Sequence, residues 1–306
     1  MGQSLESRIS ERIYHPTVRM IYSEFVRLGH QELTTRILES MPVDSLGPIE
    51  QALATHVHKE KSVIAQYIGD SLGADHNQTQ IVATACDLLW GLSLLYDDVI
   101  DDDQIRAGMP TSWVRYGKQR TMSAVYDGVE VIVKLLQSRV NPETTNACSH
   151  YVQQGIDSYD EISRITFDSP LNAILMNYIR RCNFHQAFPV IALFRYIGTN
   201  NPEKESVVLE ALQAGNQAGQ LINDLKDCSV MTFGREPFRD VENGVTTIPI
   251  KLLWDQMDSE EKYEYLKLHG KDGLNSNDVR ILNYLFTKYY VAEQCKARIV
   301  EGYTVF

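Results

Sequence analysis

Apolar residues recur three and four positions apart through almost the whole of this 306-residue chain. That spacing is the period of an amphipathic helix, whereas a half-buried strand needs strict alternation, which here never extends beyond a few residues. The helical pattern covers residues 17–29, 50–73, 78–98, 120–138, 144–162, 171–198, 205–228, 245–256 and 276–300. We therefore expect an all-α fold, a single large helical bundle with little room for a sheet.

The chain shows no internal division. Glycine and proline fall mainly between the helical segments, and no linker rich in these residues separates two halves. The 43% hydrophobic content is enough for one large core or two modest ones. No repeat of fixed period stands out. The economical interpretation is one domain spanning residues 1–306.

Charge and cysteine usage exclude several classes of partner. A formal net charge of -11 disfavours nucleic acid and anionic membranes, because both require a basic surface. The apolar runs are too short and too interrupted to span a bilayer, and the polar start of the chain gives no sign of a signal peptide. The five scattered cysteines are typical of reduced thiols. We expect a cytoplasmic protein without a membrane span.

The first acidic cluster is residues 97–103, Asp-Asp-Val-Ile-Asp-Asp-Asp, and it follows the apolar stretch 78–96 without a break. Asp97 and Asp101 lie four residues apart, so both point from one face of a helix. A solvated helix end is the simplest interpretation of an acidic run. The apolar helix before it instead favours carboxylates that emerge from a core, where they would suit Mg²⁺ and a phosphate-rich substrate.

The second cluster ends another helical stretch, residues 215–227. Asn223 and Asp227 again lie four residues apart on one face. Gly215 and Gly219 each cost about 1 kcal/mol in a helix interior, which close packing or a nearby substrate would offset. A kinked structural helix is the alternative, and the existence of the first cluster favours a second group of metal ligands.

These clusters resemble the two aspartate-rich motifs of the trans-isoprenyl diphosphate synthase superfamily, which has the all-α terpenoid synthase fold. The first motif is matched by Asp97-Asp98-x-x-Asp101 and the trailing Arg106-x-Gly108-x-Pro110-Thr111, and the second by Gln220-x-x-Asn223-Asp224-x-x-Asp227. Residues 180–198 resemble the helix that carries a phosphate-binding lysine in that family. The resemblance runs from about residue 55 to 255 and implies a homodimer with a single catalytic domain in each chain.

The resemblance also implies roles for individual residues. A prenyl diphosphate would bind with three Mg²⁺ ions, and Asp97, Asp101, Asn223 and Asp227 would be the catalytic ligands. Asp98, Asp102 and Asp224 would be supplementary ligands or would support the others. The diphosphate would contact Arg106, Arg180 and Arg235, and Lys226 would either reach it or be solvated. Candidates to line an apolar cavity for the carbocation are Trp90, Ser93, Tyr96, Phe184 and Phe188, although aromatic residues at helical spacing more often belong to the core.

Other positions depart from the family pattern. Chain-elongating members bind isopentenyl diphosphate through a Gly-Gly-Lys-x-x-Arg element, and residues 57–61 here are Val-His-Lys-Glu-Lys. Trp90 occupies the position of a usual histidine, Ala107 that of an arginine and Val245 that of a lysine. Neither Lys nor Ala replaces the bidentate contacts of Arg. The isopentenyl site is therefore expected to be lost while the allylic site is kept.

If an enzyme ionises a prenyl diphosphate without binding isopentenyl diphosphate, the prenyl cation must react with another nucleophile. Intramolecular cyclisation, as in class I terpene synthases, is the simplest outcome, and Asn223 also resembles the asparagine of their metal motif. The glutamate usual in that motif is replaced by Met231. Three alternatives stay open: transfer to another nucleophile such as an indole, elongation through a remodelled pocket, and a non-catalytic partner subunit.

The metal assignment predicts the behaviour of an Asp97→Ala variant. Because the carboxylate would be a Mg²⁺ ligand, its removal should abolish Mg²⁺-dependent release of diphosphate from a prenyl diphosphate. Phosphate analysis after pyrophosphatase treatment measures that release. Activity retained by the variant would refute the assignment.

Overall fold

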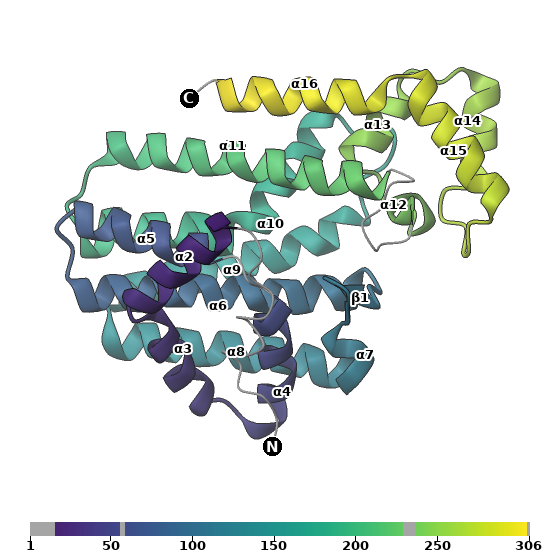
Figure 1. Cartoon of the computed structure of the whole chain (residues 1–306). Helices are drawn as coiled ribbons and strands as arrows, with labels where there is room; N and C mark the ends of the chain where they lie inside the picture. The colour runs from purple at the N-terminus through teal and green to yellow at the C-terminus, as the bar shows by residue number, and fades with distance from the viewer. Residues whose placement is uncertain (1–15, 56–58, 229–236, 305–306) are drawn as a thin grey trace. The chain divides into compact units, whose positions relative to one another are not determined.

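The computed structural model describes residues 16–55, 59–228 and 237–304. In order, the first elements are α2 (Pro16–Arg27), α3 (His30–Glu39), α4 (Val43–Thr55), α5 (Glu60–Ser71), α6 (His76–Ile100), β1 (Ile105–Arg106), β2 (Met109–Pro110), α7 (Ser112–Tyr116) and α8 (Lys118–Arg139) (Figure 1). There follow α9 (Pro142–Ile162), α10 (Leu171–Ile191), the π-helix η1 (Ala192–Ile197), α11 (Pro202–Asp227), α12 (Arg239–Glu242), α13 (Ile248–Trp254), α14 (Ser259–Leu266), α15 (Ser276–Lys288) and α16 (Val291–Thr304). The all-α prediction is confirmed.

Backbone contacts divide the chain into two compact units. Unit 1 comprises residues 1–152 and 183–208, and unit 2 comprises residues 153–182 and 209–306. Both acidic clusters were assigned to one domain from the sequence, and that assignment stays a prediction. The first cluster belongs to unit 1 and the second to unit 2.

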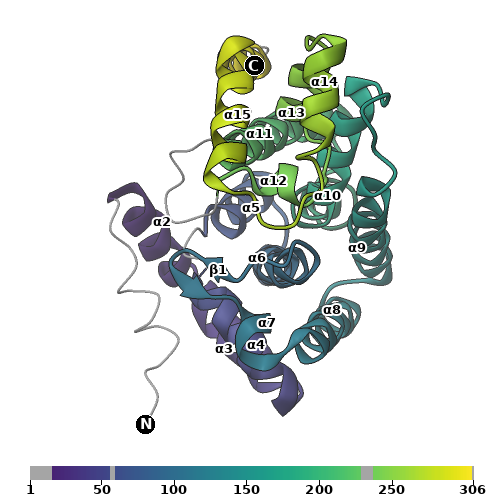
Figure 2. The same ribbon diagram turned by 90° about the vertical axis from the view of Figure 1, so that its right-hand side faces the viewer.

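Helix α6 is the central element of unit 1. It packs against α3, α4, α5, α7, α8 and η1, and Figure 2 looks along its axis and shows α4, α5, α7 and α8 around it. Its apolar side chains are correspondingly inaccessible, with Val82, Ala83, Ala85 and Leu95 fully buried. Removing such side chains from water is the main stabilising contribution to a helix of this kind.

Contrary to the expectation that the apolar runs are too short for a span, this helix is long and apolar enough to cross a membrane by length and composition alone. Within its most apolar stretch, however, 72% of the residues are buried inside the protein. A core helix of a globular protein passes the same test, so this composition is weak support for a span.

A hairpin of two short strands follows α6. β1 and β2 pair antiparallel, with Arg106 opposite Met109. The turn places Ala107 and Gly108 at φ values of 51° and 74°, in the left-handed region that a two-residue hairpin turn requires. Little room for a sheet was expected, and strands of two residues are too short to show any alternation of apolar and polar residues.

Unit 2 has its own hydrophobic core. Buried side chains of α10 to α16 form one cluster, which includes Tyr178, Leu221, Leu253 and Leu282 together with Phe238 just before α12. The segment 276–300, expected as one helix, is two: α15 ends at Lys288, and Tyr290 has a φ of 50° before α16 begins. Because neither glycine nor proline lies at this break, the helical period of apolar residues continues across it in the sequence.

A buried histidine ties α3 to α6 in unit 1. His30 is completely buried, its Nδ1 lies 2.9 Å from Oγ1 of Thr84, and its ring stacks on Phe25. Burial lowers the pKa of His30 to about 4, although the nearby Asp87 acts in the opposite direction. The imidazole is therefore neutral in the folded protein at neutral pH.

This histidine predicts acid sensitivity. In the unfolded chain His30 binds a proton below its ordinary pKa of about 6.5, whereas the folded protein resists protonation until about pH 4. The free energy of unfolding should therefore fall by about 3 kcal/mol between these pH values on account of this residue. Urea unfolding of wild type and His30→Gln across that range measures the difference, with the exposed His150→Gln as control. Parallel pH profiles for wild type and His30→Gln would contradict the prediction.

Candidate functional site

The first acidic cluster lies where α6 leaves the core of unit 1. The helix ends at Ile100, and the N–H of Asp101 donates to the carbonyl oxygen of Asp97 at 2.9 Å. Asp98 is buried, whereas Asp97 and Asp101 are half-buried. The helical spacing places these last two carboxylates one turn apart on the same face, as the sequence predicted.

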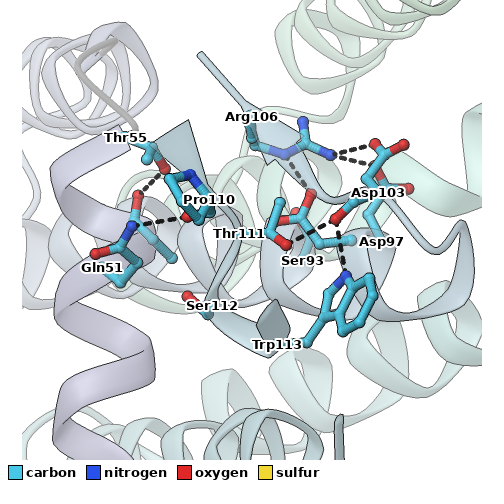
Figure 3. A network of polar contacts seen from close by, with 12 residues as sticks. Gln51, Thr55, Ser93, Asp97, Asp103, Arg106, Pro110, Thr111, Ser112 and Trp113 are labelled. Atoms are coloured by element: carbon cyan, nitrogen blue, oxygen red, sulfur yellow. Dashed lines mark hydrogen bonds and ion pairs between the residues drawn. The ribbon is translucent and has the colours of Figure 1, made fainter. Parts of the chain in front are cut away.

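Arg106 in β1 forms ion pairs with three carboxylates of the cluster (Figure 3). Its Nη2 donates to Oδ2 of Asp97 at 3.0 Å and to Oδ2 of Asp103 at 3.5 Å, and its Nε donates to Oδ1 of Asp98. Only 16% of the arginine side chain is exposed, so water screens these charge-assisted bonds weakly. These hydrogen bonds hold the hairpin against the end of α6.

Side chains from beyond the hairpin fix the loop that follows the cluster. Oγ1 of Thr111 and Nε1 of Trp113 both donate to the carbonyl oxygen of Asp103, at 2.7 and 2.8 Å (Figure 3). Asp102 and Ala107 hold left-handed φ values of 56° and 51°. Such a conformation costs a non-glycine residue about 1 kcal/mol, and surrounding contacts must offset it. Asp103 belonged to the predicted acidic cluster without a role of its own, and Trp113 was missed, because neither contact is local in a helix or strand.

The cluster concentrates negative charge in a poorly solvated place. Burial raises the pKa of Asp98 to about 7, Arg106 opposes that rise, and Asp97 and Asp103 add to it. Burial alone would lower the pKa of Arg106, but Asp97 and Asp98 raise it above its ordinary value and keep the guanidinium charged. The repulsion that Asp97 and Asp103 exert on the Asp98 carboxylate favours an additional cation, which would relieve it.

The donor set suits a hard divalent cation in its chemistry. Asp97, Asp98 and Asp101 offer carboxylate oxygens, which Mg²⁺ prefers. Within the described ranges, no three His, Cys, Asp or Glu side chains lie close enough together to hold a metal ion between them. A Mg²⁺ ion here would therefore complete its shell with water and substrate oxygens, which is its usual behaviour in phosphate sites.

The second acidic cluster forms the end of α11 in unit 2. Asp224 and Asp227 are buried, Asn223 is half-buried and Lys226 is exposed. Oη of Tyr178 in α10 donates to Oδ2 of Asp224. Burial, together with this carboxylate, raises the pKa of Tyr178 well above its ordinary value, so the phenol stays a donor. Tyr178 was missed in the sequence because it lies 46 residues before its partner.

The basic candidates are placed differently from one another. Nη1 of Arg180 pairs with the carboxylate of Glu161 within unit 2, where both side chains are more than a third exposed. The guanidinium of Arg181 lies 4.5 Å from the ring centre of Tyr159. Arg235 lies outside the described residues. The diphosphate-binding roles of Arg180, Arg235 and Lys226 stay predictions.

The candidate cavity residues of unit 1 are mostly packed among helices. Tyr96, Phe184 and Phe188 are buried. Nζ of Lys61 lies 3.7 Å from the ring centre of Trp90, and the ring centres of Trp90 and His185 lie 4.3 Å apart in a T-shaped arrangement. Oγ of Ser93 donates to the carbonyl oxygen of Trp90 at 2.7 Å. Their role in lining a cavity for the prenyl chain is untested by these contacts.

The model of one protein family, Polyprenyl synthetase, matches residues 49–285. The geranylgeranyl diphosphate synthase of Saccharolobus solfataricus is 23% identical over 214 residues, which cover 66% of this chain and 64% of that enzyme. Among solved structures, the polyprenyl synthase from Caulobacter crescentus in complex with calcium and isoprenyl diphosphate superposes with a TM-score of 0.81 at 16% identity, covering 99% of this chain and 90% of that one. A geranylgeranyl pyrophosphate synthase from Lactobacillus brevis gives 0.77 at 18% identity, covering 96% and 90%.

The contacts of Arg106 predict a metal-dependent rescue of stability. Arg106→Gln leaves the carboxylates of Asp97, Asp98 and Asp103 without their guanidinium, so the free energy of unfolding should fall by about 3 kcal/mol. Millimolar Mg²⁺ should restore part of that loss, because it would neutralise the same oxygens. Urea unfolding with and without Mg²⁺ measures both effects.

The exposed Arg139→Gln serves as the control for this variant. It should change the free energy of unfolding by less than about 0.5 kcal/mol in either condition. Equal losses in the two variants, or no greater stabilisation of Arg106→Gln by Mg²⁺ than of wild type, would contradict the role of Arg106.

Proposed function

Because this chain belongs to the polyprenyl synthetase family, we propose that it is a Mg²⁺-dependent prenyltransferase that ionises an allylic prenyl diphosphate. We further propose that the acceptor of the prenyl cation carries no diphosphate. The enzymes it resembles are isoprenyl diphosphate synthases, which favours prenyl transfer over the cyclisation expected first from the sequence. A homodimer in the cytoplasm remains part of the prediction.

Both acidic motifs carry the proposed ionisation chemistry. Asp97 and Asp101 would hold Mg²⁺ in the first motif, and Asn223 and Asp227 would hold it in the second. When bound, Mg²⁺ would neutralise the negative charge that builds up on the departing diphosphate. Arg106 adds a rigid fork of donors that matches phosphate oxygens, and its contacts with Asp97 already place it beside the first motif.

A buried ion pair is the observation that carries the acceptor part of the proposal. Lys59 lies in the stretch that corresponds to the isopentenyl-binding element, and its side chain is only 3% exposed. Its Nζ lies 2.8 Å from Oδ2 of Asp87, which is fully buried in α6. A buried carboxylate that neutralises the ammonium leaves little net charge there to attract a second diphosphate.

The other lysine of this stretch contacts an aromatic ring. The ammonium of Lys61 is held over the indole of Trp90 at 3.7 Å. Trp90 precedes Asp97 by two turns of α6, about 10 Å along the helix axis. At the corresponding arginine position, Ala107 occupies the hairpin turn. An acceptor with an aromatic or apolar nucleophilic group fits this chemistry better than isopentenyl diphosphate does.

Intramolecular cyclisation is the second candidate, and the pair of Lys59 and Asp87 favours it as well. If no acceptor is captured, the double bonds of the prenyl chain are the nucleophiles nearest to the cation. Asn223 at the start of the second motif agrees with this candidate, because class I terpene synthases carry the same residue type there. The two candidates share the ionisation step and differ in the nucleophile.

Product analysis separates the candidates. Purified protein with Mg²⁺ receives C10, C15 or C20 prenyl diphosphate alone, with isopentenyl diphosphate, or with indole and a tryptophan-containing peptide. We expect diphosphate release to rise with the aromatic acceptors and their prenylated forms to be detected by mass spectrometry. Asp97→Ala is the negative control.

Each remaining outcome counts against part of the proposal. Longer prenyl diphosphates formed with isopentenyl diphosphate would overturn the acceptor assignment. Cyclic hydrocarbons or cyclic alcohols formed without any acceptor would establish cyclisation in its place. Diphosphate release in no arm would overturn the ionisation chemistry itself.

A further inference from the structure

A tyrosine of unit 2 holds one carboxylate of the second acidic motif from the interior. Tyr178 lies in α10 and is 4% exposed, and Asp224 in α11 is 7% exposed. The phenol hydroxyl donates to Oδ2 of Asp224. A buried carboxylate requires such a donor, because it has lost the hydrogen bonds that water would supply.

The same hydroxyl is anchored by a third helix. The backbone N–H of Ile248, the first residue of α13, donates to Oη of Tyr178 at 3.2 Å. That N–H is one of the groups that a helix start leaves without an intrahelical partner. The phenol therefore accepts from α13 and donates to α11, so its position relative to both helices is fixed.

This connection fixes the orientation of the second motif on α11. Asn223 precedes Asp224 by one residue and Asp227 follows by three, so the direction of one side chain sets the direction of the others around α11. Asp224 is directed toward Tyr178, and Asn223 is less buried than Asp224. A rotation of α11 about its axis would break the bond to Tyr178 before it moved the other two residues far.

We propose that Tyr178 is a positioning residue of the second acidic motif. Its hydroxyl holds Asp224 as an internal anchor, and thereby sets the direction in which Asn223 and Asp227 present their oxygens to a divalent cation and its diphosphate. This inference rests on the proposed function, since it takes the second motif as a metal site. Asp224 then acts through its position and need not be a ligand.

Metal binding measured without turnover tests the proposal. Mn²⁺ is titrated in the presence of inorganic diphosphate and followed by electron paramagnetic resonance. Loss of a residue that orients metal ligands weakens metal affinity by roughly ten-fold or more, and we expect that loss for Tyr178→Phe. Tyr265→Phe is the matched control, because this tyrosine is fully buried in the same core and its hydroxyl faces His269 at 3.4 Å.

Variants of Asp224 separate an anchor from a ligand, and they replace Tyr178→Phe should that variant not fold. Asp224→Asn keeps an acceptor for the phenol, so an anchor predicts a smaller loss of affinity than that of Asp224→Ala, which should lose about as much as Tyr178→Phe. In the Asp224→Ala background, Tyr178→Phe should have no further effect, because the bond is already absent.

The outcomes distinguish this inference from the proposed function. If wild type binds Mn²⁺ with diphosphate and Tyr178→Phe binds it equally well, the positioning role is refuted and the proposed function stands. Equal weakening in Tyr265→Phe would show a merely structural effect and would also refute it. Absence of binding to wild type would overturn both proposals.

Discussion

The burial of α6 is the constraint on which the rest of unit 1 depends. A 25-residue helix with this many apolar side chains has to be surrounded, and six elements of unit 1 pack against it. Its last turn carries carboxylates, which need hydrogen-bonding or charged partners wherever they are buried. Just beyond the end of the helix, Arg106 supplies such a partner to Asp97, to the buried Asp98 and to Asp103. The physics that builds the core therefore also creates a concentrated anionic site at its edge.

Asp87, a carboxylate a few turns earlier in the same helix, remains buried. Asp87 stays in the core because Lys59 neutralises it there, at the expense of an ammonium group that could otherwise face a substrate. Two carboxylates of one helix thus have opposite consequences. Asp97 contributes to a surface that favours an added cation, and Asp87 removes a cation from the stretch that resembles the isopentenyl-binding element. This contrast is the structural reason for separating ionisation of the allylic substrate from the choice of acceptor.

Much of the architecture could be predicted because the apolar period of 3.6 residues is a local signal. It marked α6, α8, α9 and α11 to within a few residues. The hairpin of β1 and β2 was missed because two-residue strands carry no period, and the break at Tyr290 was missed because a non-glycine residue adopts the turn. Contacts between side chains that are distant in the sequence follow no such period, so they are harder to predict than helices.

The candidate site shows the same limit. Asp97 and Asp101 could be recognised from their spacing, but their relation to Arg106 depends on how the hairpin folds back. The hydrogen bond between Tyr178 and Asp224 joins residues 46 positions apart, and the sequence contains no signal for it. The sequence does contain a signal for Asp87, because a charged residue in the middle of an apolar stretch requires a buried partner.

A crystal structure of the protein with Mg²⁺ and inorganic diphosphate would show whether the carboxylates at the end of α6 bind a metal and a diphosphate. We expect metal density in contact with Asp97 and Asp101, with Arg106 withdrawn from Asp97 and donating to the diphosphate. Arg106 still bound to Asp97, Asp98 and Asp103, with neither metal nor diphosphate at the end of α6, would contradict this expectation.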